Sequence, residues 1–301
     1  MGVTTDPAVV RRLDLARWLR PLAWATLAAN VVLVVTGGAV RLTSSGLGCP
    51  TWPRCTERGM TPHGELNVHS AIEFGNRMLT FVLVAIAVLT VVAAWQTGRR
   101  DLRRLSVLIL CGIPAQAVIG GITVLTDLNP WVVSLHLVAS MAIIGVSVLL
   151  LWRVYTVAAG SATDAVAHGP VVWLAWATFA VAWLVIYAGT VVTGAGPHAG
   201  DLDSPRNGLD PLRISQVHAD LVCLFIGLTV GLLFTSYALK APAATRQAAW
   251  VLLAVELSQA TIGWVQYFTD LPIVLVGCHM LGAALISAAV TWVLLRIRHA
   301  G

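Results

Sequence analysis

The chain has 301 residues, of which 57 % are hydrophobic and only 11 % are charged. With a mean hydropathy of +0.81, this composition excludes an ordinary soluble domain and is typical of a protein with several membrane spans. The formal net charge of +5 comes from basic residues that flank apolar runs. It therefore reflects membrane topology and gives no reason to expect nucleic-acid binding.

Taken in chain order, the apolar runs recur at lengths that suit membrane helices, since about 20 residues cross roughly 30 Å of hydrocarbon. We expect eight spans, at residues 22–43, 68–95, 105–126, 131–153, 171–194, 214–239, 247–268 and 273–295. The N-terminal stretch lacks a small-residue cleavage site and its apolar run is too long, so we expect no cleavable signal peptide.

Basic residues gather at alternate connections between the expected spans. They are Arg11, Arg12, Arg17, Arg20, Arg99, Arg100, Arg103, Arg104, Arg153, Lys240, Arg246, Arg296 and Arg298. The opposite connections are acidic, so the positive-inside rule predicts that both termini are cytoplasmic. Lysine occurs once against eighteen arginines, which favours a GC-rich bacterial genome. We expect a multi-pass protein of the bacterial plasma membrane.

Parts of the sequence repeat, which is typical of an internal duplication. "AQAVIGGITVLTDLNPWVVSLHLVAS" (115–140) lines up with "SQATIGWVQYFTDLPIVLVGCHMLGA" (258–283), and "VHSAIEF" (68–74) matches "VHADLVC" (217–223). We expect an all-α membrane protein whose eight transmembrane helices form two parallel, duplicated four-helix bundles. The expected divisions are a cytoplasmic segment (1–20), a first bundle (21–155), a cytoplasmic linker (156–170) and a second bundle (171–298).

Four histidines lie at repeat-equivalent places within the expected spans: His69, His136, His218 and His279. A single histidine in a span is often just hydrogen-bonded inside a bundle. Two in each half, on matching helices, favour axial ligation of haem iron, which imidazoles on facing bundle helices commonly hold. Zinc is disfavoured because no cysteine or carboxylate joins either pair at ligand spacing.

Glu73 is a carboxylate within a span, and an ionisable group in that position is by default a functional-site hypothesis. The repeat has Val222 in its place. The structural alternative is an ion pair with Arg77, four residues further along the same helix. Glu256, in the seventh expected span, is a second such carboxylate, and we interpret it as structural.

Cys49 and Cys55 lie in the first outer loop, as "CPTWPRC". The oxidising side of the membrane makes a disulfide plausible there, with a structural or a redox role.

These residues resemble one known family. "GGAVRLTSSGLGCPTWPRC" in the outer loop, "IEFGNR" at the start of the second span, and His136 and His279 in the fourth and eighth spans are similar to haem A synthase from about residue 30 to 295. The resemblance implies oxidation of a haem O ring methyl to a formyl group, giving haem A for cytochrome oxidase. The family's essential glutamate matches Glu73, and its loop cysteines match Cys49 and Cys55.

The resemblance further implies a substrate haem in the N-terminal half and a haem B cofactor in the C-terminal half. It makes Arg41, Asn76 and Arg77 candidate substrate contacts. It implies haem O synthase, the cytochrome oxidase assembly machinery and an unnamed electron donor as partners, and it is compatible with a homo-oligomer.

The sequence departs from the family motif Glu-x-x-His-Arg, because the expected histidine is Asn76. Counted at 1.5 Å per residue from charged or aromatic residues at the cytoplasmic ends, Asn76 and Phe225 are level with His136 and His279. The same count places His69 and His218 about 10 Å further out. Either the haems sit higher in this protein, or His136 and His279 each bind iron alone from one side. The joint displacement of the histidine in both halves favours ligation by all four.

Two other functions remain open at this point. A dihaem b-type membrane cytochrome that carries electrons between quinol and a partner would need the histidines but not Glu73. A transporter would need broken spans at matching positions, and only Pro114 interrupts one.

Overall fold

A computed structural model describes residues 14–57, 59–62, 67–156 and 169–298. The expected segment 1–20 and linker 156–170 fall largely outside these residues. After a short turn of 3-10 helix (η1, Ala16–Trp18), the helices within the described residues are α1 (Leu19–Leu42), α2 (Val68–Gln96), α3 (Arg100–Leu125), α4 (Pro130–Thr156), α5 (Gly169–Ala195), α6 (Pro211–Ala238), α7 (Ala243–Phe268) and α8 (Ile273–Arg298).

All eight helices are long and apolar enough to cross a membrane, which confirms the expected spans. The largest difference is at α3, which begins at Arg100 instead of 105. Its first turn is charged, and long arginine side chains prolong a helix into the headgroup region because their charged ends can reach water. Pro114 lies inside α3 without ending it, as membrane helices tolerate.

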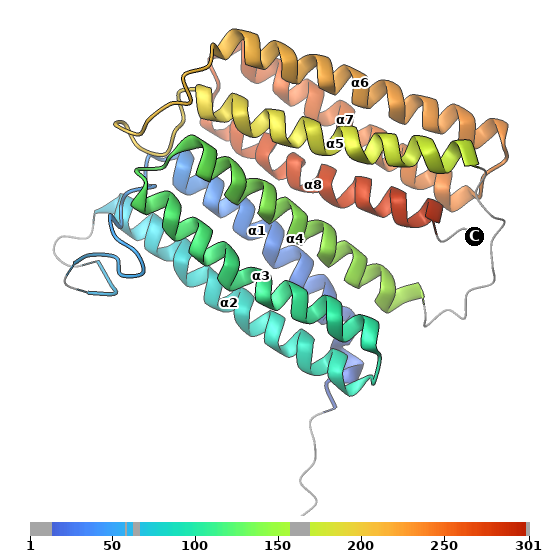
Figure 1. Cartoon of the computed structure of the whole chain (residues 1–301), viewed down its shortest axis with the longest axis horizontal. Helices are drawn as coiled ribbons and strands as arrows, with labels where there is room; N and C mark the ends of the chain where they lie inside the picture. The colour runs from blue at the N-terminus through green and yellow to red at the C-terminus, as the bar shows by residue number, and fades with distance from the viewer. Residues whose placement is uncertain (1–13, 58, 63–66, 157–168, 299–301) are drawn as a thin grey trace, which may run out of the picture.

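The helices form two groups (Figure 1). In the first, α1 packs on α2 and α4, and α3 packs on α2 and α4; in the second, α5 packs on α6 and α8, and α7 packs on α6 and α8. The groups meet where α8 lies against α1 and α4, and where α5 lies against α4. We call them the first and second helix groups.

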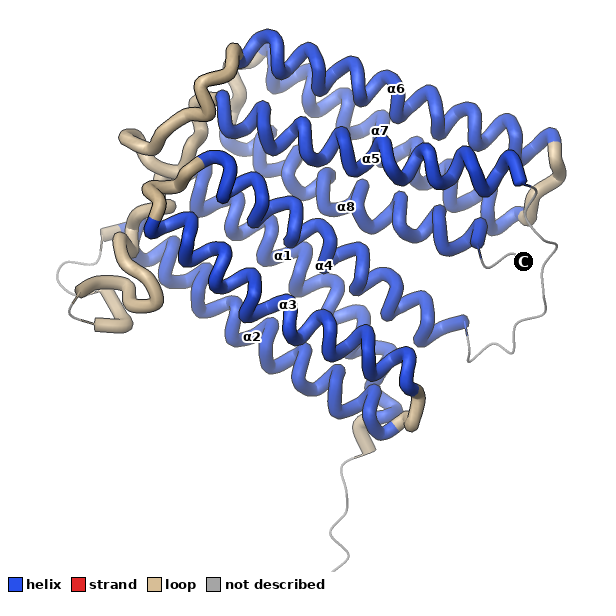
Figure 2. Tube along the Cα trace, viewed as in Figure 1, coloured by secondary structure: helices blue, strands red, loops and turns tan. Residues whose placement is uncertain are grey.

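The connections after the odd-numbered helices gather at one end of the molecule, which we call the loop end (Figure 2). Two of them turn in the same way, because Asp127 and Leu128 have positive φ angles of 50° and 59°, and Asp270 and Leu271 of 55° and 54°. Loops of the two groups also touch. The Gly46 N–H donates to the Gly200 carbonyl over 2.9 Å.

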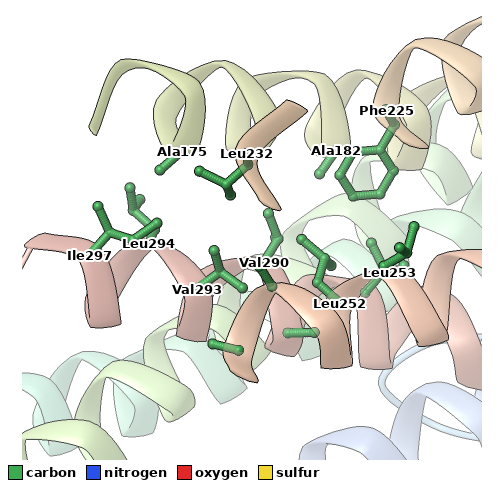
Figure 3. Packing of buried hydrophobic residues seen from close by; sticks show 14 of the residues in the cluster. Ala175, Ala182, Phe225, Leu232, Leu252, Leu253, Val290, Val293, Leu294 and Ile297 are labelled. Atoms are coloured by element: carbon green, nitrogen blue, oxygen red, sulfur yellow. The ribbon is translucent and has the colours of Figure 1, made fainter. Parts of the chain in front are cut away.

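An apolar cluster fills much of the second group (Figure 3) and also includes Val34 of α1 and Met141 and Ile144 of α4. Leu232, Leu252 and Val290 are fully or almost fully buried there, and alanines such as Ala175 and Ala182 let the helices approach closely. Phe225 is only 2 % exposed and belongs to this cluster. His218 and His279 lie nearer the loop ends of α6 and α8 than the residues of this cluster do.

Candidate functional site

One polar residue in each even-numbered helix lies at the same depth in the bundle. These residues are Asn76 in α2, His136 in α4, His218 in α6 and His279 in α8. Each lies about two turns from the loop end of its helix and about 30 Å from the other end, at 1.5 Å per residue. The four residues therefore lie at the same depth whether residues are counted from the loop end or from the other end of each helix.

Each of these side chains rests on a glycine of the preceding helix. Measured from an ideal Cβ built on the glycine to the nearest side-chain atom, the contacts are Gly37 to Asn76 (3.9 Å), Gly120 to His136 (3.2 Å), Gly189 to His218 (3.1 Å) and Gly263 to His279 (3.3 Å). The three imidazoles are so close that a methyl group would already displace them. We call these four places the glycine seats.

The imidazoles on the glycine seats have unused bonding capacity. Among the described residues, Nδ1 of His136, His218 and His279 is buried without a hydrogen-bond partner. Since burying an unpaired polar atom costs free energy, these rings fit the requirements of ligands to a bound group.

A free metal ion fits less well. Within the described ranges, no group of three or more His, Cys, Asp and Glu side chains is placed to hold one. Paired imidazoles without further ligands instead suit a cofactor that brings its own equatorial donors, such as haem.

The depths counted from the sequence were wrong for His218. That count put His218 about 10 Å beyond His279, but the two lie at one level. The residues used as markers do not stand at equivalent helix positions: α8 runs past Arg296 to Arg298, while α6 stops at Ala238, before Lys240.

His69 does not share the glycine-seat arrangement. It lies in the first turn of α2, where its Nδ1 and the Ser45 Oγ are 3.0 Å apart. With Asn67, Asp201 and Asp203 it lines a cavity of about 600 Å³ at the loop end. His69 therefore faces the loops.

Glu73 is buried, with 5 % of its surface exposed, and is held at both oxygens. Its Oε2 accepts a hydrogen bond from the Cys49 backbone N–H over 2.6 Å. Its Oε1 accepts from Arg77 Nη2 over 2.5 Å, which confirms the ion pair considered from their spacing. Arg77 also donates to the carbonyls of Cys49, Thr51 and Arg54. The carboxylate thus ties α2 to the first loop.

That loop is closed on itself and packed on the helices. Cys49 and Cys55 form a disulfide, as expected, and both are almost fully buried. Trp52 packs directly on Gly121 of α3, and Gly48 rests against the His69 backbone. The loop therefore covers Glu73 and shields it from water.

Arg41 and Asn76, predicted as substrate contacts, have protein partners. Arg41 donates from Nε to the His198 carbonyl (2.6 Å) and from Nη2 to the Thr193 carbonyl (2.9 Å), so it joins the two helix groups. Asn76 Oδ1 accepts a hydrogen bond from the Thr36 hydroxyl over 2.7 Å.

Comparison with known proteins decides the family. Residues 20–71 and 64–200 match the sequence profile of the COX15-CtaA family, described as cytochrome oxidase assembly protein. This match covers more than half of the chain. The chain belongs to the COX15-CtaA family.

Curated relatives of this COX15-CtaA member carry the name haem A synthase. The protein of Lysinibacillus sphaericus is 35 % identical over 182 residues, 58 % of each chain. That of Staphylococcus epidermidis is 26 % identical over 210 residues, 65 % of this chain and 69 % of its own. That of Geobacillus thermodenitrificans is 32 % identical over 149 residues. The alignments with the first and third span about half of those relatives' lengths.

Sequence reasoning missed two features of this COX15-CtaA member. The first is the set of glycine seats. The signal for it in the sequence was that Gly120 and Gly263 occupy the same place in the repeated stretch. The other is the partner of Glu256, which is 2 % exposed. Its Oε1 accepts a hydrogen bond from the Thr229 hydroxyl over 2.6 Å; no spacing rule links residues on separate helices.

Proposed function

We propose that this chain oxidises the ring methyl of haem O to a formyl group, giving haem A for cytochrome oxidase. The observation that carries the proposal is the buried Glu73, fixed beneath a disulfide-closed loop in the helix group that also holds His136. The second helix group has Val222 instead and no such loop cysteines. An electron carrier would have no use for this asymmetry, whereas an enzyme with one reacting centre would.

The first helix group is the substrate half in this proposal. His136 would hold the iron of haem O, with its ring steadied against Gly120. Glu73 lies one turn nearer the loop end than Asn76 and on the same helix face. It accepts one hydrogen bond on each oxygen, so lone pairs remain to take a proton or to hold a water molecule at the reacting methyl. Arg77 fixes the carboxylate and offsets its charge.

The second helix group is the cofactor half. His218 and His279, which lie at the same depth on glycine seats, would hold haem B. A haem in that place would supply one-electron redox chemistry. The apolar cluster around Phe225 closes the group beneath it, so these residues exclude water from the site.

We infer that the two helix groups, 21–155 and 171–298, are duplicated bundles of the same orientation. The turns at Asp127–Leu128 and Asp270–Leu271 support this, because both use successive positive φ angles and the same backbone hydrogen bond. Leu128 donates to Thr123 over 2.8 Å, and Leu271 donates to Gln266 over 2.9 Å. The glycine seats recur in both halves as well.

In the cell, we place the chain in the bacterial plasma membrane with both termini cytoplasmic, because the arginines Arg99, Arg100, Arg103 and Arg104 lie opposite the loop end. A disulfide at the loop end agrees with an oxidising outer face. Haem O synthase, the cytochrome oxidase assembly machinery and an electron donor are the partners that this function requires.

The test is haem extraction from a bacterial host without haem A that expresses this chain together with a haem O synthase. Haem A in the extract, absent when the chain is omitted, is the expected result. Bound haem B with unconverted haem O would contradict the proposal and favour the dihaem cytochrome.

A further inference from the structure

The four glycine seats lie at the same depth and each has a glycine behind it, with an ideal Cβ at 3.9 Å from Asn76 and at 3.1–3.3 Å from the three imidazoles. They are not chemically equivalent. The second helix group presents two imidazoles, His218 and His279. The first presents one imidazole, His136, and one amide, Asn76. A planar group bound between the paired seats would therefore meet a ligand on both faces in one half and on a single face in the other.

Asn76 cannot replace the missing imidazole. Its amide nitrogen has no lone pair to give, and its Oδ1 already accepts the Thr36 hydroxyl over 2.7 Å. Haem iron in proteins is held by His, Cys, Met or Tyr side chains, not by carboxamides.

His69 cannot replace it either. It lies seven residues before Asn76, about 10 Å along the helix axis. Its ring faces Ser45 and the loop-end cavity, on the far side of Glu73 from the glycine seat. Moving it into the bundle would unwind the start of α2, where the Asn67 side chain accepts the His69 N–H over 3.1 Å.

We propose that haem in the first helix group is held through His136 alone, and that its other axial position, beside Asn76 and one turn below Glu73, is open to a small neutral ligand. The haem between His218 and His279 is closed on both faces. This inference rests on the proposed function only in taking haem as what the first group binds. On this inference, Asn76 is the residue that makes the iron of the first group reactive, whereas the iron of the second group only carries electrons.

The open position is tested with carbon monoxide, which binds ferrous haem only where an axial position is free. The full-length chain is purified with both haems bound and reduced, and the carbon monoxide spectrum is recorded against the haem-to-protein ratio. One of the two haems should bind carbon monoxide. Asn76→Ala should keep this binding, because the amide is not a ligand.

Asn76→His should close the position. If the new imidazole is bound in all but about 1 % of molecules, the apparent affinity for carbon monoxide falls about a hundredfold. The same variant should gain a second low-spin signal in the electron paramagnetic resonance spectrum. The converse variant, His218→Asn, should open the second haem, so that both bind.

Three results would overturn the inference. The first is that the unaltered chain does not bind carbon monoxide. The second is that the Asn76→His variant retains both haems and binds carbon monoxide as well as the unaltered chain does. The third is that the chain binds only one haem. Failure of the proposed function is a separate result, because haem extraction measures haem A and carbon monoxide binding needs no turnover. If haem A is formed but carbon monoxide does not bind, only the open axial position is refuted. If carbon monoxide binds but no haem A is formed, only the proposed enzyme activity is refuted.

Discussion

Replacing Gly263 by leucine should empty the second helix group of haem while leaving the first loaded. A Cβ at this position lies 3.3 Å from His279 Cε1, against 3.5–4.0 Å for an optimal carbon contact. Alanine would push the ring aside by a few tenths of an ångström. Forcing a side chain off its preferred rotamer costs about 0.5–1.5 kcal/mol, which weakens haem binding by about two- to tenfold. Leucine adds three further carbons and should remove the imidazole from its seat.

The assay is the haem-to-protein ratio of the purified chain, with the low-spin haem signal as a second readout. Gly227→Leu is the matched control, because α6 has open space there, with no atom within 4 Å of a Cβ built at Gly227. Gly37→Ala is a control in the first group, where the Cβ distance is an ordinary 3.9 Å. A Gly263→Leu protein that keeps both haems and an unchanged low-spin signal would refute the glycine-seat argument.

The other predictions concern residues that hold the scaffold. Glu256→Gln should lower stability by less than about 1 kcal/mol in thermal unfolding, because the amide oxygen still accepts the Thr229 hydroxyl; a larger loss would show that the charge matters. Replacing Cys49 and Cys55 together by serine should cost about 2 kcal/mol for so short a loop and admit protease to the loop; unchanged digestion would contradict this. Arg41→Ala should lower thermal stability by about 1–3 kcal/mol without changing haem content; haem loss at unchanged stability would instead make Arg41 a haem contact.

Much of the fold could be predicted because membrane helices are set by local rules. The length of each apolar run fixes a span, since every backbone polar group must be satisfied within it. The Thr-Asp-Leu turns and the disulfide between Cys49 and Cys55 were also predictable, because each depends on residues near one another in sequence. The ion pair of Glu73 with Arg77 follows from four-residue spacing on a helix.

The register between helices could not be predicted in the same way. Sequence similarity paired His69 with His218, but in the structure it is Asn76 that lies at the same depth as His218. The reason is that His69 is one residue after the start of α2, whereas His218 is seven residues after the start of α6. Charged residues at the helix ends did not give reliable depths, because the number of residues between the charged residue and the end of the helix differs from helix to helix. Contacts between separate helices, such as that of Thr229 in α6 with Glu256 in α7, depend on the rotation of each helix about its axis, which no local sequence rule gives.

Oxidation of the substrate in the first helix group should depend on Glu73. The most direct measurement compares the unaltered chain with Glu73→Gln in a host that lacks haem A but makes haem O, by extracting haem and measuring protein-bound haem B in the same samples. We expect haem A from the unaltered chain, and haem O in place of haem A from Glu73→Gln, with equal haem B in both. Haem A at equal levels from both chains would contradict it.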